Sequence, residues 1–168
     1  VNASEATRIH SNGVLSAAAG IALGVGTANT ASNVLEDYEE GTFTPSVVNG
    51  AGLDSISYSA QTGAYTKIGN MVMVTFRIGI SSASKNSSRL DFTGLPFTSF
   101  NGVFEGGAYF SYMDANFSST VNATISLYQP SNSTKFAAYK TNGANFSGND
   151  INSTSGMDIY ITGFYRSA

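Results

Sequence analysis

The stretch NMVMVTFRIGIS, residues 70–81, decides the fold class because apolar and other side chains alternate along it with a period of two. This period is that of a β-strand with one buried face. The face predicted to be buried consists of Val72, Val74, Phe76, Ile78 and Ile80. The opposite face carries Met71 and Met73 and is therefore half apolar, so we expect it to meet a second surface.

The same alternation recurs in residues 120–128 and 157–166, and residues 103–113 resemble a strand with a bulge or bend at Gly106–Gly107. Turn-forming residues separate these segments, and no segment has a convincing helical period. Short strands at this spacing predict an all-β fold, an antiparallel β-sandwich of jelly-roll type. A closed barrel is the alternative.

Residues 1–36 differ from the rest because they lack Phe, Tyr and Trp and are rich in Ala, Gly, Ser, Asn and Thr. So little side-chain volume cannot build a core of its own. We therefore expect either a flexible tail or a short extended β shaft shared within an oligomer, followed by a β-sandwich domain at residues 37–168.

The chain has 168 residues, and only 11% of them are charged, against about 25% in ordinary soluble domains. Its eight Lys and Arg residues are scattered and its net charge is −3, which argues against nucleic acid binding. The absence of cysteine excludes disulfides and thiolate metal sites. His10 is the single histidine and lies far in sequence from the predicted domain, which disfavours a hydrolase triad.

The segment LEDYEEGTFTP, residues 35–45, contains a cluster of acidic residues. Its members are Glu36, Asp37, Glu39 and Glu40. Their spacing suits neither a calcium loop, which alternates ligands around a glycine, nor a glycosidase pair from separate elements. We interpret the cluster as a charged connector, with Thr42–Thr44 beginning the first strand of the domain. We expect no catalytic residue, metal or cofactor.

Two predicted turns combine aromatic rings with Asn and Asp, the residue types that stack on sugar rings and fix sugar hydroxyls. The candidate binding residues are Tyr109, Tyr112, Asp114, Asn116, Tyr139, Asn142 and Asn145. The competing interpretation is that the aromatic side chains belong to the core and the Asn residues form turns.

Three segments together resemble a C-terminal module in tail fibres and related adhesins of tailed bacteriophages. They are NVLEDYEEGTFTP (33–45), ISYSAQTGAYTKIGNMVMVTFRIGIS (56–81) and LDFTGLPF (90–97). The segment TRIHSNGVLS (7–16) is similar to a motif that often ends the fibre shaft, although His10 stands where Asp is usual. Phe43 likewise stands where Trp is common. The motifs cover about the first 100 residues, and the remainder matches by strand pattern alone.

The resemblance implies a homotrimer at the distal end of a virion tail fibre, attached to the remainder of the fibre. It also implies receptor binding at the host surface, either to a glycan or to another outer-membrane receptor. We expect binding without catalysis. A purely structural trimerisation or capping module is one alternative. A polysaccharide depolymerase is another, with carboxylates drawn from Asp91, Glu105, Asp114, Asp150 and Asp158.

Overall fold

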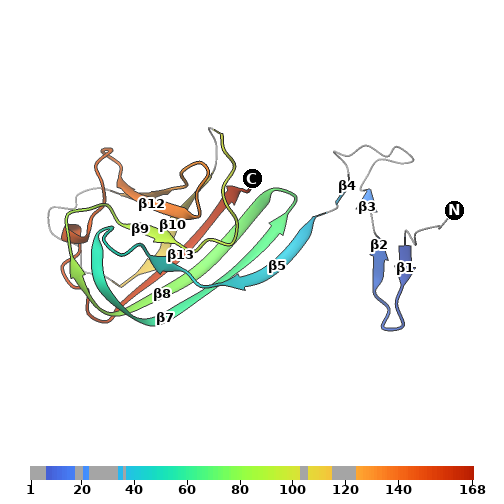
Figure 1. Cartoon of the computed structure of the whole chain (residues 1–168), viewed down its shortest axis with the longest axis horizontal. Helices are drawn as coiled ribbons and strands as arrows, with labels where there is room; N and C mark the ends of the chain where they lie inside the picture. The colour runs from blue at the N-terminus through green and yellow to red at the C-terminus, as the bar shows by residue number, and fades with distance from the viewer. Residues whose placement is uncertain (1–6, 18–20, 23–33, 36, 103–105, 115–123) are drawn as a thin grey trace.

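The structure, a computed structural model, is built almost entirely from β-strands (Figure 1). It describes residues 7–17, 21–22, 34–35, 37–102, 106–114 and 124–168. The one helical element of these residues is a single 3₁₀ turn, η2 (Gly148–Asp150). None of the described helices is long and apolar enough to cross a membrane.

Nine strands form one antiparallel sheet, which confirms the predicted all-β class. In spatial order they are β5 (Tyr38–Phe43), β7 (Leu53–Ile68), β8 (Met71–Lys85), β13 (Met157–Arg166), β10 (Gly106–Met113), β11 (Ile125–Tyr128), β12 (Lys135–Lys140), β9 (Asp91–Thr93) and β6 (Ser46–Val47). The predicted strand 157–166 matches β13. Of the predicted strands 103–113 and 120–128, residues 103–105 and 120–123 lie outside the described residues.

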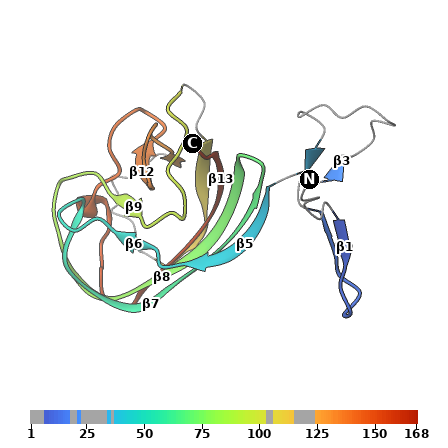
Figure 2. The same cartoon turned by 45° about the vertical axis from the view of Figure 1, so that its right-hand side comes forward.

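The sheet is rolled, because its two edge strands, β5 and β6, are consecutive in the sequence. Only Thr44 and Pro45 separate them, so the two edges of the sheet must come close together. Figure 2 shows β7 and β8 curving beneath β9 and β12, so that two parts of the same sheet face each other. The two layers expected of a sandwich are thus opposite parts of one continuous sheet.

The core lies inside the roll, and β8 supplies one wall of it. The predicted inward face of residues 70–81 is buried as expected, with Ile78 and Ile80 fully inaccessible. Aromatic side chains fill the space between the layers, among them the fully buried Phe92, Phe136 and Tyr165. Burial of large apolar side chains at this density is the main favourable term in the folding of such a domain.

Hydrogen bonds fasten the corner between β5 and β6 to the long strand β7. The Tyr58 hydroxyl accepts from the Val47 amide at 3.0 Å and donates to the Val47 carbonyl at 3.2 Å. The Gln61 side-chain amide donates to the Pro45 carbonyl at 2.9 Å. Gly94 packs against the Thr44 carbonyl with φ +90°, a space and a conformation that only glycine fits readily.

Two glycines let aromatic rings lie flat across β5 and β7. The Tyr65 ring covers Gly41, and the Phe43 ring covers Gly63, so that a methyl group at either glycine would overlap a ring. Tyr65 also packs edge-on against Phe97, with ring centroids 5.2 Å apart. These residues belong to the segments that resemble tail fibres, and in the structure they help to close the roll.

The acidic cluster enters the sheet earlier than expected, because β5 begins at Tyr38 and not at Thr42. Register with β7 places Glu39 opposite Lys67, and Lys67 forms an ion pair with Asp37. The Tyr65 hydroxyl donates to the Glu39 carboxylate. Pairing to β7 therefore draws the end of the connector into the rolled sheet, while Glu36 lies outside the described residues.

The N-terminal segment forms two small separate ladders beside the rolled sheet (Figure 1). One pairs β1 (Thr7–Ile9) with β2 (Leu15–Ala17), and the other pairs β3 (Ile21–Ala22) with β4 (Val34–Leu35). Residues 7–16 of the first hairpin are all exposed, including Ile9 and Leu15. A two-stranded hairpin without cover is marginally stable in water.

We predict that Tyr58→Phe lowers the free energy of unfolding by about 1–3 kcal/mol, because the buried Val47 backbone loses both partners. Chemical denaturation measures this change. Tyr128→Phe is the matched control, since that ring is exposed, and its effect should stay below about 0.5 kcal/mol. Equal effects of the two substitutions would contradict the proposed role of the Tyr58 hydroxyl.

Candidate functional site

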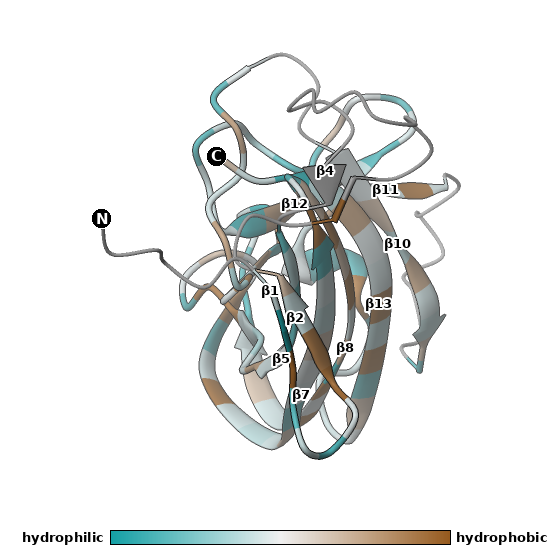
Figure 3. Ribbon diagram, turned by 90° about the vertical axis from the view of Figure 1, so that its right-hand side faces the viewer, coloured by the Kyte–Doolittle hydropathy of each residue, from teal (hydrophilic) through white to brown (hydrophobic). Residues whose placement is uncertain are grey.

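The outer face of β8, β13 and β10 gathers exposed aromatic side chains from strands far apart in the sequence. Register places Tyr109 opposite Thr162, and Tyr112 opposite Tyr160, which in turn faces Arg77. Figure 3 shows hydrophobic and hydrophilic bands alternating along these strands, as expected when one face is buried and the other is open. The sequence-predicted residues Tyr109 and Tyr112 therefore share one surface.

A β-bulge makes this possible. Strict alternation from Tyr109 would turn Tyr112 inward, but the pairing of β10 with β13 shifts between Phe110 and Tyr112, at Ser111. The extra residue returns Tyr112 to the outer face, while Phe110 stays against the core, 5.7 Å from the Phe92 ring centroid. At Gly106–Gly107, where the sequence predicts a bulge or bend, the pairing with β13 is regular, and the bulge of β10 lies instead at Ser111. Gly106 has a positive φ of +133°, and a side chain there would overlap β13.

Tyr112 and Tyr160 form an exposed pair of rings beside an ion pair. Their centroids are 5.7 Å apart in an edge-to-face arrangement. Arg77 Nε donates to Asp158 Oδ1 at 3.0 Å, and Arg77 Nη2 donates to Oδ2 at 3.1 Å. The hydrogen bond to Asp158 raises the pKa of Arg77, whose guanidinium lies 5.7 Å from the Tyr160 ring centroid. We name this group of four residues the tyrosine–arginine cluster.

Asp114 lies at the end of β10, next to this cluster. Its amide donates to the Asp158 carbonyl at 2.8 Å, and its side chain is exposed. Asn116, the fourth candidate in this turn, lies outside the described residues. The structure thus brings Tyr109, Tyr112 and Asp114 to one region of the sheet.

Side chains of the second predicted turn are engaged within the protein to a larger extent than those of the first. The Tyr139 hydroxyl accepts from Arg89 Nη1, and the Arg89 guanidinium lies 4.9 Å from the Tyr139 ring centroid. Asn142 Oδ1 accepts from the Ala144 amide at 3.1 Å, as in an Asx turn. Asn145 is exposed and bridges to Tyr139 through the backbone. The first turn therefore offers more unengaged aromatic surface than the second.

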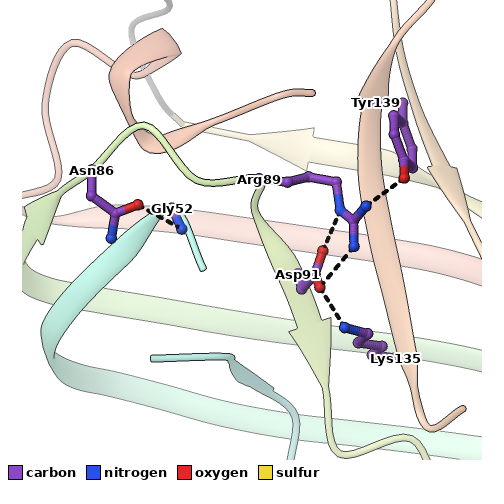
Figure 4. A network of polar contacts seen from close by, with 6 residues as sticks. All are labelled: Gly52, Asn86, Arg89, Asp91, Lys135 and Tyr139. Atoms are coloured by element: carbon purple, nitrogen blue, oxygen red, sulfur yellow. Dashed lines mark hydrogen bonds and ion pairs between the residues drawn. The ribbon is translucent and has the colours of Figure 1, made fainter. Parts of the chain in front are cut away.

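A nearly buried carboxylate organises the network around Tyr139 (Figure 4). Asp91 accepts from Arg89 Nε at 2.6 Å and Nη2 at 3.0 Å, and from Lys135 Nζ at 2.6 Å. Burial raises the pKa of Asp91, but hydrogen bonds from Arg89 and Lys135 outweigh burial and hold the pKa below 3.8. The network joins β9 to β12 and fixes the position of Tyr139.

The carboxylates considered for a depolymerase are scattered and mostly paired. Asp150 accepts from Lys140 Nζ at 2.8 Å, and Asp91 and Asp158 are paired as described. Glu105 lies outside the described residues, and Asp114 is the exposed carboxylate next to Asp158. The described residues contain no group of three or more His, Cys, Asp or Glu side chains able to hold a metal ion.

A shallow groove of about 860 Å³ adjoins the tyrosine–arginine cluster on the same face. Met71, Met73, Phe164 and Tyr109 line it, together with small residues such as Gly107. None of its lining residues is charged.

Sequence reasoning missed Arg77 and Tyr160, and it considered Asp158 only as a possible depolymerase carboxylate. Their outward orientation follows from the alternation within 70–81 and 157–166, but their proximity depends on the antiparallel register of β8 with β13. The pairs Asp158↔Gly79 and Tyr160↔Arg77 show this register, and no local signal in either strand specifies it.

Comparison with solved structures supports a bacteriophage tail protein, located in the virion tail. The chain is similar to the crystal structure of the Dettilon tailspike protein, with a TM-score of 0.59 and 25% sequence identity. The likeness covers 78% of this chain but only 24% of that one, so it spans about a quarter of the tailspike. No family model matches the chain, and no curated protein matches it significantly.

We predict that Asp91→Asn destabilises the protein by about 1–3 kcal/mol at pH 7, because Arg89 and Lys135 lose their charged acceptor. A lowered pKa in the folded state contributes stability above pH 3.8, and this stability is lost as the pH falls through the folded pKa. The difference between wild type and variant in urea denaturation should therefore shrink as the pH falls below 3.8. A constant difference across this range would contradict the assigned ionisation.

Proposed function

We propose that this protein is the homotrimeric distal tip of a phage tail fibre and binds a host cell-surface glycan without cleaving it. The observation that carries the proposal is the tyrosine–arginine cluster: two exposed rings and a charged pair held on one face of a rigid sheet. The likeness to a tailspike supports a receptor-binding or depolymerase type of protein.

The chemistry of the cluster suits a pyranose ring. The exposed ring surfaces of Tyr112 and Tyr160 can cover the C–H face of a sugar. Arg77 Nη1 makes no hydrogen bond with the described residues, so it is available to donate to a hydroxyl, and the Asp158 carboxylate can accept from a neighbouring one. Two adjacent hydroxyls on one sugar would engage both groups at once.

Position on the sheet makes the cluster suitable for a weak but repeated interaction. Three of its residues come from the long paired strands β8 and β13, so little conformational entropy is lost when a sugar binds. In a trimer, three such sites act on one host surface, and effective concentration raises the avidity above the affinity of each site.

A depolymerase is the second candidate, because Asp114 and Asp158 are neighbours at this same cluster. Glycoside hydrolysis needs a carboxylic acid and a carboxylate flanking one bond. Release of new reducing ends from host polysaccharide, abolished by Asp114→Asn, would favour this candidate over binding alone.

We predict that Tyr112→Ala combined with Tyr160→Ala weakens glycan binding at least about tenfold per site, because the stacking surface is removed. Binding to a host-glycan array and to host cells measures the effect. Asn142→Ala combined with Asn145→Ala is the matched control in the other predicted turn, and it should bind as wild type does.

Two results would contradict the proposal. Unchanged binding by the double tyrosine variant would place the receptor elsewhere. Failure of the folded wild-type protein to bind any host glycan or host cell would favour the purely structural capping module.

A further inference from the structure

An apolar patch covers the part of the outer face nearest the start of β5. The ladders make it continuous: Tyr38 lies opposite Ile68, Ile68 opposite Met71, and Met73 opposite Phe164. Phe164 lies opposite Gly107 of β10, which lies opposite Tyr128 of β11. We define the patch by its large members: Tyr38, Ile68, Met71, Met73, Tyr109, Tyr128 and Phe164.

The centre of the patch is the shallow groove of about 860 Å³. Gly107 and Phe164, which lie opposite each other on β10 and β13, both line it. Absence of charge and enrichment in Met, Phe and Tyr are typical of the central part of an interface between proteins. A glycan would find few groups here to satisfy its hydroxyls, whereas an apolar protein surface fits.

The patch is large for a surface that stays in water. Each of its seven members is between 45% and 58% exposed. Half-exposed side chains of this size present about 100 Å² each, so the patch totals roughly 700 Å². That value exceeds the roughly 300–600 Å² of the largest patch on a typical monomer and approaches the 800 Å² or so that each partner buries in a stable complex.

A second exposed apolar element, the β1–β2 hairpin, precedes the patch in the sequence. The β1–β2 hairpin exposes Ile9, Val14 and Leu15, and such a hairpin needs cover to be stable. The N-terminal segment leads directly into β5, whose first residue is Tyr38, itself a member of the patch. One neighbouring molecule placed at this end of the domain can cover both elements.

We propose that the apolar patch is the surface against which a second copy of this chain packs. This inference rests on the proposed homotrimer and adds the face through which its subunits meet. It divides the outer face in two: Tyr109 falls within the interface, while Tyr112, Tyr160, Arg77 and Asp158 stay accessible beyond it. Each subunit then keeps one open tyrosine–arginine cluster.

The test is the mass of Met73→Lys combined with Phe164→Lys in solution. Two ammonium groups facing each other on adjacent strands cannot be buried in an apolar interface. Light scattering should give about three times 17.5 kDa for the wild type and 17.5 kDa for the variant, with an unchanged β-sheet circular dichroism signal. Tyr112→Lys, on the same face outside the patch, is the matched control and should keep the wild-type mass.

A second measurement does not depend on the folding of the charged variant. The chain has no cysteine, so Met73→Cys and Thr62→Cys each introduce one exposed thiol into the monomer surface. In the intact oligomer a maleimide should react at least about tenfold more slowly at position 73 than at position 62, because only the former is covered.

A lysine variant that keeps the wild-type mass overturns the inference, and so do equal maleimide rates or a monomeric wild type. The glycan-binding function fails separately: an oligomer that protects position 73 but binds no host glycan supports the interface and contradicts the function. A monomeric lysine variant should retain binding per site and lose avidity.

Discussion

The fold depends on one closure: the corner at Thr44–Pro45, where the chain passes from one edge of the sheet to the other. Rolling a nine-stranded sheet brings its edges together only if this corner is held, and Tyr58, Gln61 and Gly94 hold it from three directions. The core is enclosed between opposite parts of the sheet as a result. The outer face of β8 and β13 points away from this core, because the core side chains of both strands lie inside the roll.

This closure explains the structural roles of residues in the segments that resemble tail fibres. Tyr58, Gln61, Gly63, Tyr65 and Gly94 all belong to the resembling segments, and each has a structural role at the corner or along β7. The resemblance therefore describes the scaffold more than any binding surface. The proposed receptor contacts lie mainly on β10 and β13, in the part of the chain matched by strand pattern alone.

Local pattern was sufficient for the central strands β8 and β13 and insufficient for the site. Alternation in 70–81 and 157–166 correctly predicted β8 and β13, because a buried face imposes its period on the sequence. The single rolled sheet was not predictable, since it depends on which strands become edges. Likewise the bulge that turns Tyr112 outward depends on register with Tyr160, 48 positions away, and the pairing of Arg77 with Asp158 depends on register across 81 positions. The sequence also predicted Tyr139 as a binding residue, because it is an aromatic residue in a polar turn. In the structure Tyr139 is held by Arg89 within a structural network.

The proposed division of the outer face assigns two tasks to one rigid surface, the apolar part to contact between subunits and the tyrosine–arginine cluster to the host. The most direct test of the cluster is a structure of the oligomer soaked with host-surface oligosaccharide. Our account predicts a sugar ring against Tyr112 and Tyr160, with hydroxyls about 2.7–3.2 Å from Arg77 Nη1 and the Asp158 carboxylate. A sugar bound instead at the Asn142–Asn145 turn, or in the groove beside Met73, would contradict it.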